Sequence, residues 1–301
     1  MTITEIYNKI ASINPIHGKK LDANFIFFNE QHDYKNQATE FLKKYTKVLN
    51  NENKDFSYAI QCYLKMIADF NEETLNFMRS GKYKHSSFDE VNKAVYDNPD
   101  IMEYHMHGLL LSQFLWKHHY QIYNYFKTNI ADYKNSTNYY LEIGAGHGLY
   151  LEEALRYLNP ATEFSVVDIS QTSIELTKSF IEDDRVNYNL IDIFDFTPAQ
   201  KYDFITMGEV LEHVEDPLRL LNRLYELLSD NGTIFITTPT NAPSIDHIYL
   251  FNNVQEIRDL ISKSGFVIKS ENSFISEDVS IERAEKRKIT ILYGAFLTKI
   301  K

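Results

Sequence analysis

A short glycine-rich loop carries the clearest binding chemistry in this sequence. It runs from Gly144 to Gly148 and follows an apolar stretch at 139–143 that contains Glu142. Glycines permit positive φ and remove side chains, so the backbone can approach a ligand while the next helix offers free N–H groups. The spacing is Gly-x-Gly-x-Gly, whereas a dinucleotide fingerprint reads Gly-x-Gly-x-x-Gly. An acid two residues before the first glycine suits a cationic amino-acid ligand better than a pyrophosphate.

Two aspartates at the ends of later apolar runs could bind a nucleoside through hydrogen bonds. Asp168 ends the run at 163–168, where a carboxylate can accept hydrogen bonds from both hydroxyls of a ribose. Asp192 follows the run at 186–191 and could accept a hydrogen bond from an adenine amino group.

Oxygen and nitrogen donors gather at Glu209, Glu212 and His213. In a helical turn, this i, i+3 and i+4 spacing would put all three side chains on one face. Hard cations take carboxylate oxygens and imidazole can join for transition ions, so we expect the three residues to hold Mg²⁺ or Mn²⁺, with His247 as a fourth ligand. Such an ion could bind vicinal oxygens of a substrate and acidify the acceptor.

His247 lies in a polar loop at 237–249 that follows another apolar run. An imidazole titrates near neutral pH, so His247 is the best single candidate for a general base as well as for the fourth metal ligand. We expect the catalytic residues to be His247, Glu209 and His213. The alternative is that His247 only caps or packs its loop.

The second half of the chain alternates between strand-like and helix-length segments. Apolar runs compatible with buried parallel strands lie at 139–143, 163–167, 186–191, 204–207 and 233–237, and two later strands are expected at 266–270 and 289–298. This alternation predicts an α/β fold with a Rossmann-like, doubly wound sheet that binds ligands at the carboxyl ends of its strands.

The first third of the chain is patterned as helices, at 37–49, 58–79 and 101–126. A polar segment at 131–138 separates it from the alternating region, so we expect a helical lid or substrate domain at 1–132 and a ligand-binding domain at 133–301. Within 101–126 an apolar stripe should face the core or the substrate. Neighbouring histidines on a helix point in different directions, so the histidines of this stretch are not expected to share a metal. We expect Tyr104 or His107 to line the substrate cavity instead.

The motifs together resemble those of class I S-adenosylmethionine-dependent methyltransferases, over roughly residues 139–301. They are Leu-Glu-Ile-Gly-Ala-Gly-His-Gly at 141–148, Val-Val-Asp-Ile-Ser at 166–170 and Tyr-Asp-Phe-Ile-Thr-Met-Gly-Glu-Val-Leu-Glu-His-Val at 202–214. The Glu-x-x-Glu-His part is similar to that of ubiquinone-pathway O-methyltransferases and small-RNA 2′-O-methyltransferases. The same letters also occur in methyltransferases without a metal, where Glu209 closes the cofactor floor and His213 makes a structural hydrogen bond.

The resemblance implies S-adenosylmethionine as cofactor, a late antiparallel hairpin and a set of cofactor residues. The glycine loop and Glu142 would surround the methionine moiety, Asp168 the ribose and Asp192 the adenine, while Met207 to Glu209 line the floor. The expected cofactor residues are Glu142, Gly144, Ala145, Gly146, Gly148, Asp168, Ile169, Asp192, Ile193, Met207 and Gly208.

Composition limits the partners. A formal charge of −11 would repel a phosphate backbone, so nucleic acid and anionic membranes are not expected. The single cysteine, Cys62, and the lack of a long apolar run predict a cytoplasmic protein, with a homodimer left open.

The leading hypothesis is methyl transfer to an oxygen or nitrogen of a small molecule, with or without a metal. Alternatives are a carbon acceptor, an intermediate bound to a carrier protein, or a non-enzymatic S-adenosylmethionine-binding regulatory subunit. A dehydrogenase shares the fold class but is disfavoured by the glycine spacing and Glu142.

Overall fold

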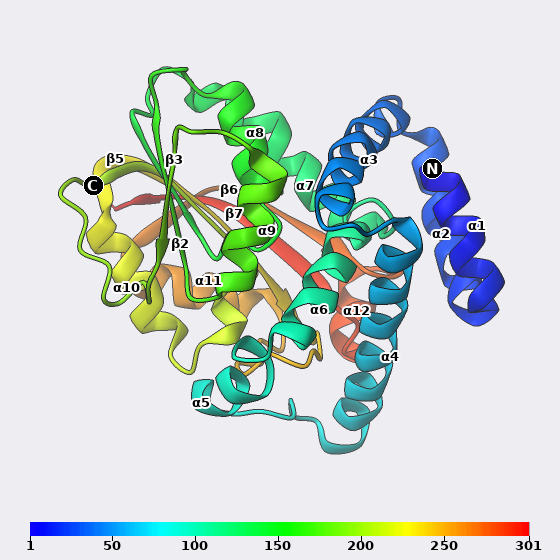
Figure 1. The fold of residues 1–301 in the computed structure, drawn as a ribbon. Coiled ribbons are helices and arrows are strands. Elements are labelled where there is room, and N and C mark those ends of the chain that lie inside the picture. The colour runs from blue at the N-terminus through cyan, green and yellow to red at the C-terminus, as the bar shows by residue number, and fades with distance from the viewer. Residues whose placement is uncertain (301) are drawn as a thin grey trace.

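The computed structural model describes residues 1–300 and contains twelve α-helices and seven strands (Figure 1). The α-helices are α1 Ile3–Ile13, α2 Pro15–Glu30, α3 Tyr34–Asn51, α4 Phe56–Ser80, α5 Phe88–Val91, α6 Pro99–Ser112, α7 Lys117–Ile130, α8 Leu149–Tyr157, α9 Gln171–Ile181, α10 Pro217–Leu227, α11 Val254–Lys263 and α12 Ile281–Arg287. The strands are β1 Tyr139–Ile143, β2 Glu163–Asp168, β3 Val186–Leu190, β4 Tyr202–Gly208, β5 Leu228–Thr240, β6 Phe266–Ile275 and β7 Ile291–Lys299. Short turns η1 Asn92–Tyr96 (a π-helix), η2 Ala131–Tyr133 and η3 Leu211–His213 (both 3₁₀) complete the set.

The strands form one sheet in the order β3-β2-β1-β4-β5-β7-β6. The first five are parallel, and β7 runs antiparallel between β5 and β6. Because β1 pairs with both β2 and β4, the direction of strand progression reverses there, and ligands bind at such switch points in doubly wound sheets. The predicted fold class, with its late antiparallel strands, is confirmed.

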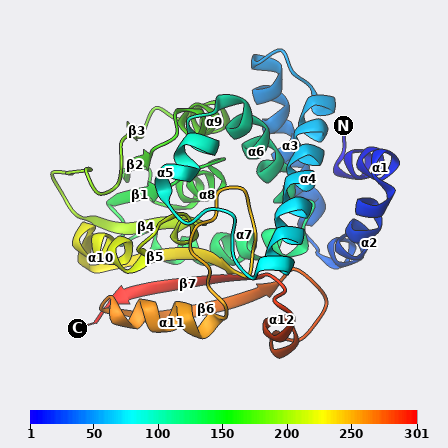
Figure 2. The same ribbon diagram turned by 90° about the horizontal axis from the view of Figure 1, so that it is seen from below.

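Alternating strand residues supply two separate cores. On β1, Tyr140 packs in a cluster with α8 and α9, whereas Leu141 and Ile143 pack in a cluster with α10 and α11. This follows from the two-residue period of a strand, since both faces of a parallel sheet must be covered by helices. Figure 2 shows the helices on both sides of the sheet.

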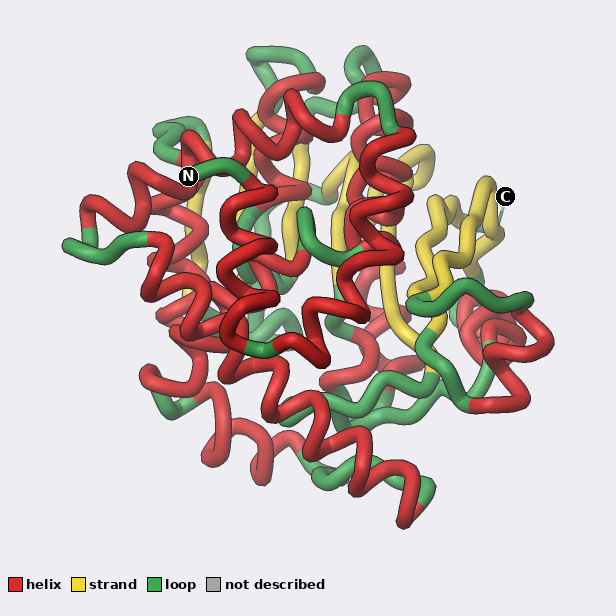
Figure 3. The backbone as a smooth tube through the Cα atoms, turned by 90° about the vertical axis from the view of Figure 1, so that its right-hand side faces the viewer, coloured by secondary structure: helices red, strands yellow, loops and turns green. Residues whose placement is uncertain are grey.

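The front helices share the first of these cores. Residues from α1 to α7 belong to the same hydrophobic cluster as Phe204 and Phe235 of the sheet. In Figure 3 these helices lie in front of the strands. Among residues 1–300, no helix has the length and low polarity needed to cross a membrane.

One sequence expectation about the fold needed correction. The helix expected at 101–126 is two helices, α6 and α7, because the chain turns at Gln113–Trp116, where Leu115 and Trp116 bond back to Ser112. The two late strands, β6 and β7, pair antiparallel as expected, with the short helix α12 between them in the chain.

Candidate functional site

The glycine loop lies at the carboxyl end of β1, as its spacing predicted. Gly144, Gly146 and Gly148 all have positive φ, of 66°, 53° and 76°. A Cβ on Gly144 would lie 2.6 Å from Cγ2 of Val210, so a side chain there would collide with the neighbouring turn. The loop therefore needs glycine for its backbone conformation and for close packing.

Two buried carboxylates flank this loop. Glu142 is buried and receives a hydrogen bond from the hydroxyl of Tyr140, and burial raises the pKa of Glu142 to about 8. Asp168 accepts a hydrogen bond from the backbone N–H of Ser170 at 2.8 Å, and burial raises its pKa to about 6. A buried carboxylate without a cation favours its neutral form, so a cationic partner would stabilise Glu142 as an anion.

A cavity of about 1050 Å³ opens above these carboxyl ends. Nine of the expected cofactor residues line it: Glu142, Gly144, Ala145, Gly146, Asp168, Ile169, Asp192, Ile193 and Gly208. Gly148 and Met207 lie outside the cavity wall. Gly148 is the N-cap of α8 and packs towards Thr177, while Met207 is fully buried in the second core.

The donors at 209–213 do not form a helical face. Glu209 has a positive φ of 54°, and only Leu211–His213 turn, as a short 3₁₀ helix. The backbone N–H of Glu209 donates to the backbone oxygen and to Oγ1 of Thr237, both at 3.0 Å. Because the left-handed residue redirects the chain, the expected i, i+3 and i+4 alignment is lost.

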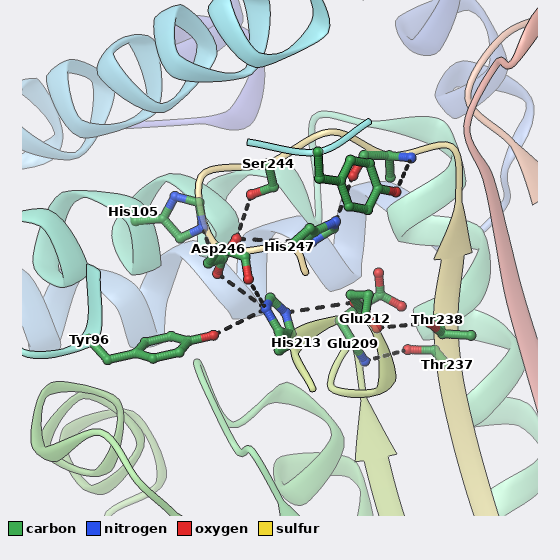
Figure 4. A network of polar contacts seen from close by, with 12 residues as sticks. Tyr96, His105, Glu209, Glu212, His213, Thr237, Thr238, Ser244, Asp246 and His247 are labelled. Carbon is green, nitrogen blue, oxygen red and sulfur yellow. Dashed lines mark hydrogen bonds and ion pairs between the residues drawn. The ribbon is translucent and has the colours of Figure 1, made fainter. Parts of the chain in front are cut away.

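Three of the four expected metal ligands nevertheless come together. One ligand atom each from Glu212, His213 and His247 lies within 4.8 Å of the others, whereas the carboxylate of Glu209 is not part of this group. The three residues are named the ligand cluster below. Figure 4 shows His213 and His247 with Glu212 beside them.

Backbone carbonyls fix both imidazoles of the ligand cluster. Nδ1 of His213 lies 3.0 Å from the backbone oxygen of Asp246, and Nδ1 of His247 lies 2.6 Å from that of Ala242. A carbonyl oxygen only accepts, so each Nδ1 carries the proton and each Nε2 keeps its lone pair. Carbonyl support of this kind is typical of metal-binding histidines.

Glu212 is the third residue of the ligand cluster. Its Oε2 accepts a hydrogen bond from Oγ1 of Thr238 at 2.8 Å, while Oε1 is buried without a hydrogen-bond partner and lies 3.7 Å from Nε2 of His213. Burial, reinforced by the nearby Glu209, raises the pKa of Glu212 well above its usual value. A buried, unpartnered carboxylate oxygen is costly unless a proton or a cation satisfies it.

Burial also affects the basicity of His247. It lowers the pKa of this imidazole to about 3, so His247 is neutral at pH 7 but only weakly basic. A weak base with a free Nε2 serves better as a ligand than as a proton acceptor.

Two residues around the ligand cluster were not anticipated. Asp246 lies 3.6 Å from Nδ1 of His213, 3.8 Å from Nε2 of His105 and 4.0 Å from Nε2 of His247, and these histidines hold the pKa of Asp246 below its usual range. The hydroxyl of Tyr96 lies 3.1 Å from Nδ1 of His213. Asp246 could have been suspected from its place beside His247, but nothing in the sequence singles out Tyr96, which projects from the π-helical turn η1.

Helix α6 presents a different face to the cavity from the one expected. Met102, His105, Met106 and Leu109 line the cavity, whereas Tyr104 and His107 do not. Tyr104 instead donates to Oδ2 of Asp69, and His107 bonds to the hydroxyl of Tyr45. Residues three and four apart share a helix face, so once Met102 faces the cavity, 104 and 107 point elsewhere.

A second group of potential ligands, Glu52, Glu103 and His107, lies away from this cavity. Lys54 bonds to both of its carboxylates, to Oε2 of Glu52 at 2.8 Å and to Oε1 of Glu103. The ammonium of Lys54 therefore already occupies the space between the two carboxylates.

Comparison with known proteins identifies the family. A family described as methyltransferase domain matches residues 115–271, which is more than half of the 301 residues. The chain therefore belongs to the methyltransferase domain family, and the resemblance drawn from its motifs is confirmed.

Curated relatives cover only part of the chain. It is 25% identical over 151 residues to malonyl-[acyl-carrier protein] O-methyltransferase 1 of Ilyobacter polytropus, which is 46% of this chain and 56% of the relative. It is 31% identical over 126 residues to the ubiquinone biosynthesis O-methyltransferase of Coxiella burnetii, 41% of this chain and 52% of the relative. The chain thus spans about half the length of these relatives.

Among solved structures, the mitomycin 7-O-methyltransferase MmcR is similar in fold. The TM-score is 0.53 at 13% identity, covering 77% of this chain and 68% of that one. At this identity the similarity concerns the fold alone.

Proposed function

We propose that the protein transfers the methyl group of S-adenosylmethionine to an oxygen of a small molecule, with a divalent cation held by Glu212, His213 and His247. The observation that carries this proposal is the orientation of the two imidazoles. Both use Nδ1 on a backbone carbonyl and keep Nε2 for a group beside the unpartnered Oε1 of Glu212.

The cofactor would lie along the carboxyl ends of β1, β2 and β4. Glu142 would pair with its ammonium group, Asp168 would accept hydrogen bonds from the ribose hydroxyls, and Asp192 would accept one from the adenine amino group. Gly144 and Gly146 would let the backbone approach the methionine moiety. The sulfonium methyl would then face the part of the cavity lined by His213 and His247.

The residues of the ligand cluster fit a transition ion better than Mg²⁺. Two imidazoles and one carboxylate match Mn²⁺, Fe²⁺ or Zn²⁺, whereas Mg²⁺ prefers oxygen ligands. A bound cation would supply Lewis-acid chemistry, lowering the pKa of an acceptor hydroxyl.

We assign the role of proton acceptor to Glu209 in place of His247. Glu209 lines the cavity, its Oε1 is buried without a hydrogen-bond partner, and burial raises its pKa to about 8. A carboxylate whose pKa lies near the pH of the solution is a stronger base than an imidazole whose pKa is about 3. Positioning in line with the methyl group accounts for the rest of the catalysis.

We further propose that residues 1–132 act as lid and substrate element over a methyltransferase domain at 133–301. Tyr96 and α6 support this division of roles, because they bring front-region side chains against His213 and into the cavity.

Calorimetric titration of Mn²⁺ and Mg²⁺ into chelator-treated protein saturated with S-adenosylhomocysteine tests the metal. We expect one Mn²⁺ per chain, binding more tightly than Mg²⁺, and an affinity at least about 100-fold lower in Glu212→Gln. Glu72→Gln, an exposed carboxylate on α4, is the matched control. Equal Mn²⁺ affinity in Glu212→Gln and the control would rule out this site.

A further inference from the structure

The cavity extends well beyond the region that the cofactor would fill. From His213 and His247 it continues past α6 to α2, α4 and the β6–α12 loop. Its volume of about 1050 Å³ lies above the range of about 300–1,000 Å³ typical of a site for one drug-sized ligand. A second molecule therefore has room beside the cofactor.

The interior of this extension is mainly apolar. Its wall is formed by residues of α4, α6, α7 and β7, interrupted by the imidazoles of His118 and His119. The apolar lining residues are Ile67, Phe70, Met102, Leu109, Trp116, Ile122 and Leu292. Each methylene of an apolar molecule that is buried there would tighten binding about fourfold.

The far end of the extension reaches the surface at a polar rim. Lys20, Asn71, Thr74 and Asp278 line the cavity there and are exposed to solvent. Lys117 crosses towards the β6–α12 loop, where its Nζ lies 3.0 Å from Oδ1 of Asp278. We call this opening the far mouth.

A different set of exposed residues lines the cofactor end of the cavity. There Ile169, Glu215, Asp216 and Arg219 line the cavity and are exposed. The cofactor and a second molecule can thus enter from opposite ends.

We infer that the methyl acceptor is an elongated, mainly apolar molecule that enters through the far mouth while the cofactor is bound. The acceptor oxygen of this molecule reaches the ligand cluster. Its apolar segment fills the space bounded by α4, α6 and β7, and its polar tail stays at the rim of the far mouth. This inference rests on the proposed function for the identity of the acceptor end.

Trp116 offers a direct readout, because it is the only tryptophan and it lines this wall. Sodium dodecanoate and sodium hexanoate would be titrated into protein saturated with S-adenosylhomocysteine, following Trp116 fluorescence. The two probes share a head group and differ only in apolar length. We expect saturable binding of dodecanoate that is at least about 100-fold tighter than that of hexanoate, since each buried methylene contributes about fourfold.

The route is tested by closing the far mouth. Cys62 is the single native cysteine and is buried, so the double variant Lys117→Cys with Asp278→Cys can be bridged selectively by a short bismaleimide. Bridging should slow dodecanoate binding at least about tenfold and leave S-adenosylhomocysteine binding unchanged. The unbridged double variant is the control.

The outcomes separate the two proposals. Protein that binds S-adenosylhomocysteine but shows no chain-length preference, or binds dodecanoate equally fast when bridged, overturns the elongated-acceptor inference alone. Protein that binds dodecanoate but not S-adenosylhomocysteine overturns the proposed function instead.

Discussion

At the scale of single residues, the proposed pairing of Glu142 with the cofactor's ammonium group would make cofactor binding depend on pH. Burial raises the pKa of Glu142 to about 8, so the free protein holds this proton at pH 7, whereas pairing with an ammonium group requires the ionised carboxylate. S-adenosylhomocysteine should therefore release close to one proton on binding at pH 7. Its affinity should rise by up to about tenfold per pH unit between pH 6.5 and 8, levelling off above the pKa.

Calorimetry in buffers of different ionisation enthalpy measures this proton release. Asp168, with a pKa of about 6, is mostly ionised at pH 7 and contributes little. Release that persists in Glu142→Gln would assign the proton to another group.

Asp246 should tune the ligand cluster without belonging to it. Its carboxylate faces His105, His213 and His247, and groups in that position typically change metal affinity about 10–100-fold when replaced. We expect Asp246→Asn to weaken Mn²⁺ binding by that factor with unchanged S-adenosylhomocysteine affinity. Ser244→Ala, which removes only the hydrogen bond to Oδ1 of Asp246, should have a smaller effect, and the reverse order would contradict this role.

At the scale of elements, η1 brings the front region to the site. Tyr96→Phe keeps the aromatic ring and removes the hydroxyl that lies 3.1 Å from Nδ1 of His213. We predict an Mn²⁺ affinity lower by about tenfold, measured by the same titration, with cofactor affinity within about twofold of wild type. Unchanged Mn²⁺ binding would show that the Tyr96 hydroxyl does not orient His213.

The strands could be predicted from the sequence more reliably than the helix boundaries and turns. The strands were predictable because apolar runs, the glycine loop and the terminal acids agree with one another, and β1, β2 and β4 lie where they were expected. The helix break at Gln113–Trp116 was not predictable, because the apolar spacing continues across it. The positive φ of Glu209 was equally hidden, and it separates Glu209 from the ligand cluster.

The cavity face of α6 could not be chosen from sequence alone. Both Tyr104 and His105 carry polar groups on an apolar helix, and only the packing of α6 against α4 decides which of them faces the cavity. Tyr96 and Asp246 contact His213 from segments that are distant in sequence, since Tyr96 precedes His213 by 117 residues and Asp246 follows it after α10 and β5.

At the scale of the whole molecule, the shared core predicts cooperative unfolding. Phe114 packs against Phe41, Tyr120 and Tyr123 in the cluster that also contains Phe204 of the sheet. Phe114→Ala should lower the free energy of unfolding by about 3–5 kcal/mol. Far-ultraviolet circular dichroism and Trp116 fluorescence should report one coincident transition, and two separate transitions would mean that residues 1–132 unfold independently.

The identity of the ligand at the carboxyl ends of β1 and β2 decides the function of the whole molecule. Calorimetric titration of the purified protein with S-adenosylhomocysteine, and separately with NAD, tests this most directly. We predict one S-adenosylhomocysteine per chain, no heat from NAD, and loss of binding in Asp168→Ala with the fold retained. Binding of NAD, or S-adenosylhomocysteine affinity unchanged in Asp168→Ala, would contradict the assignment of this site.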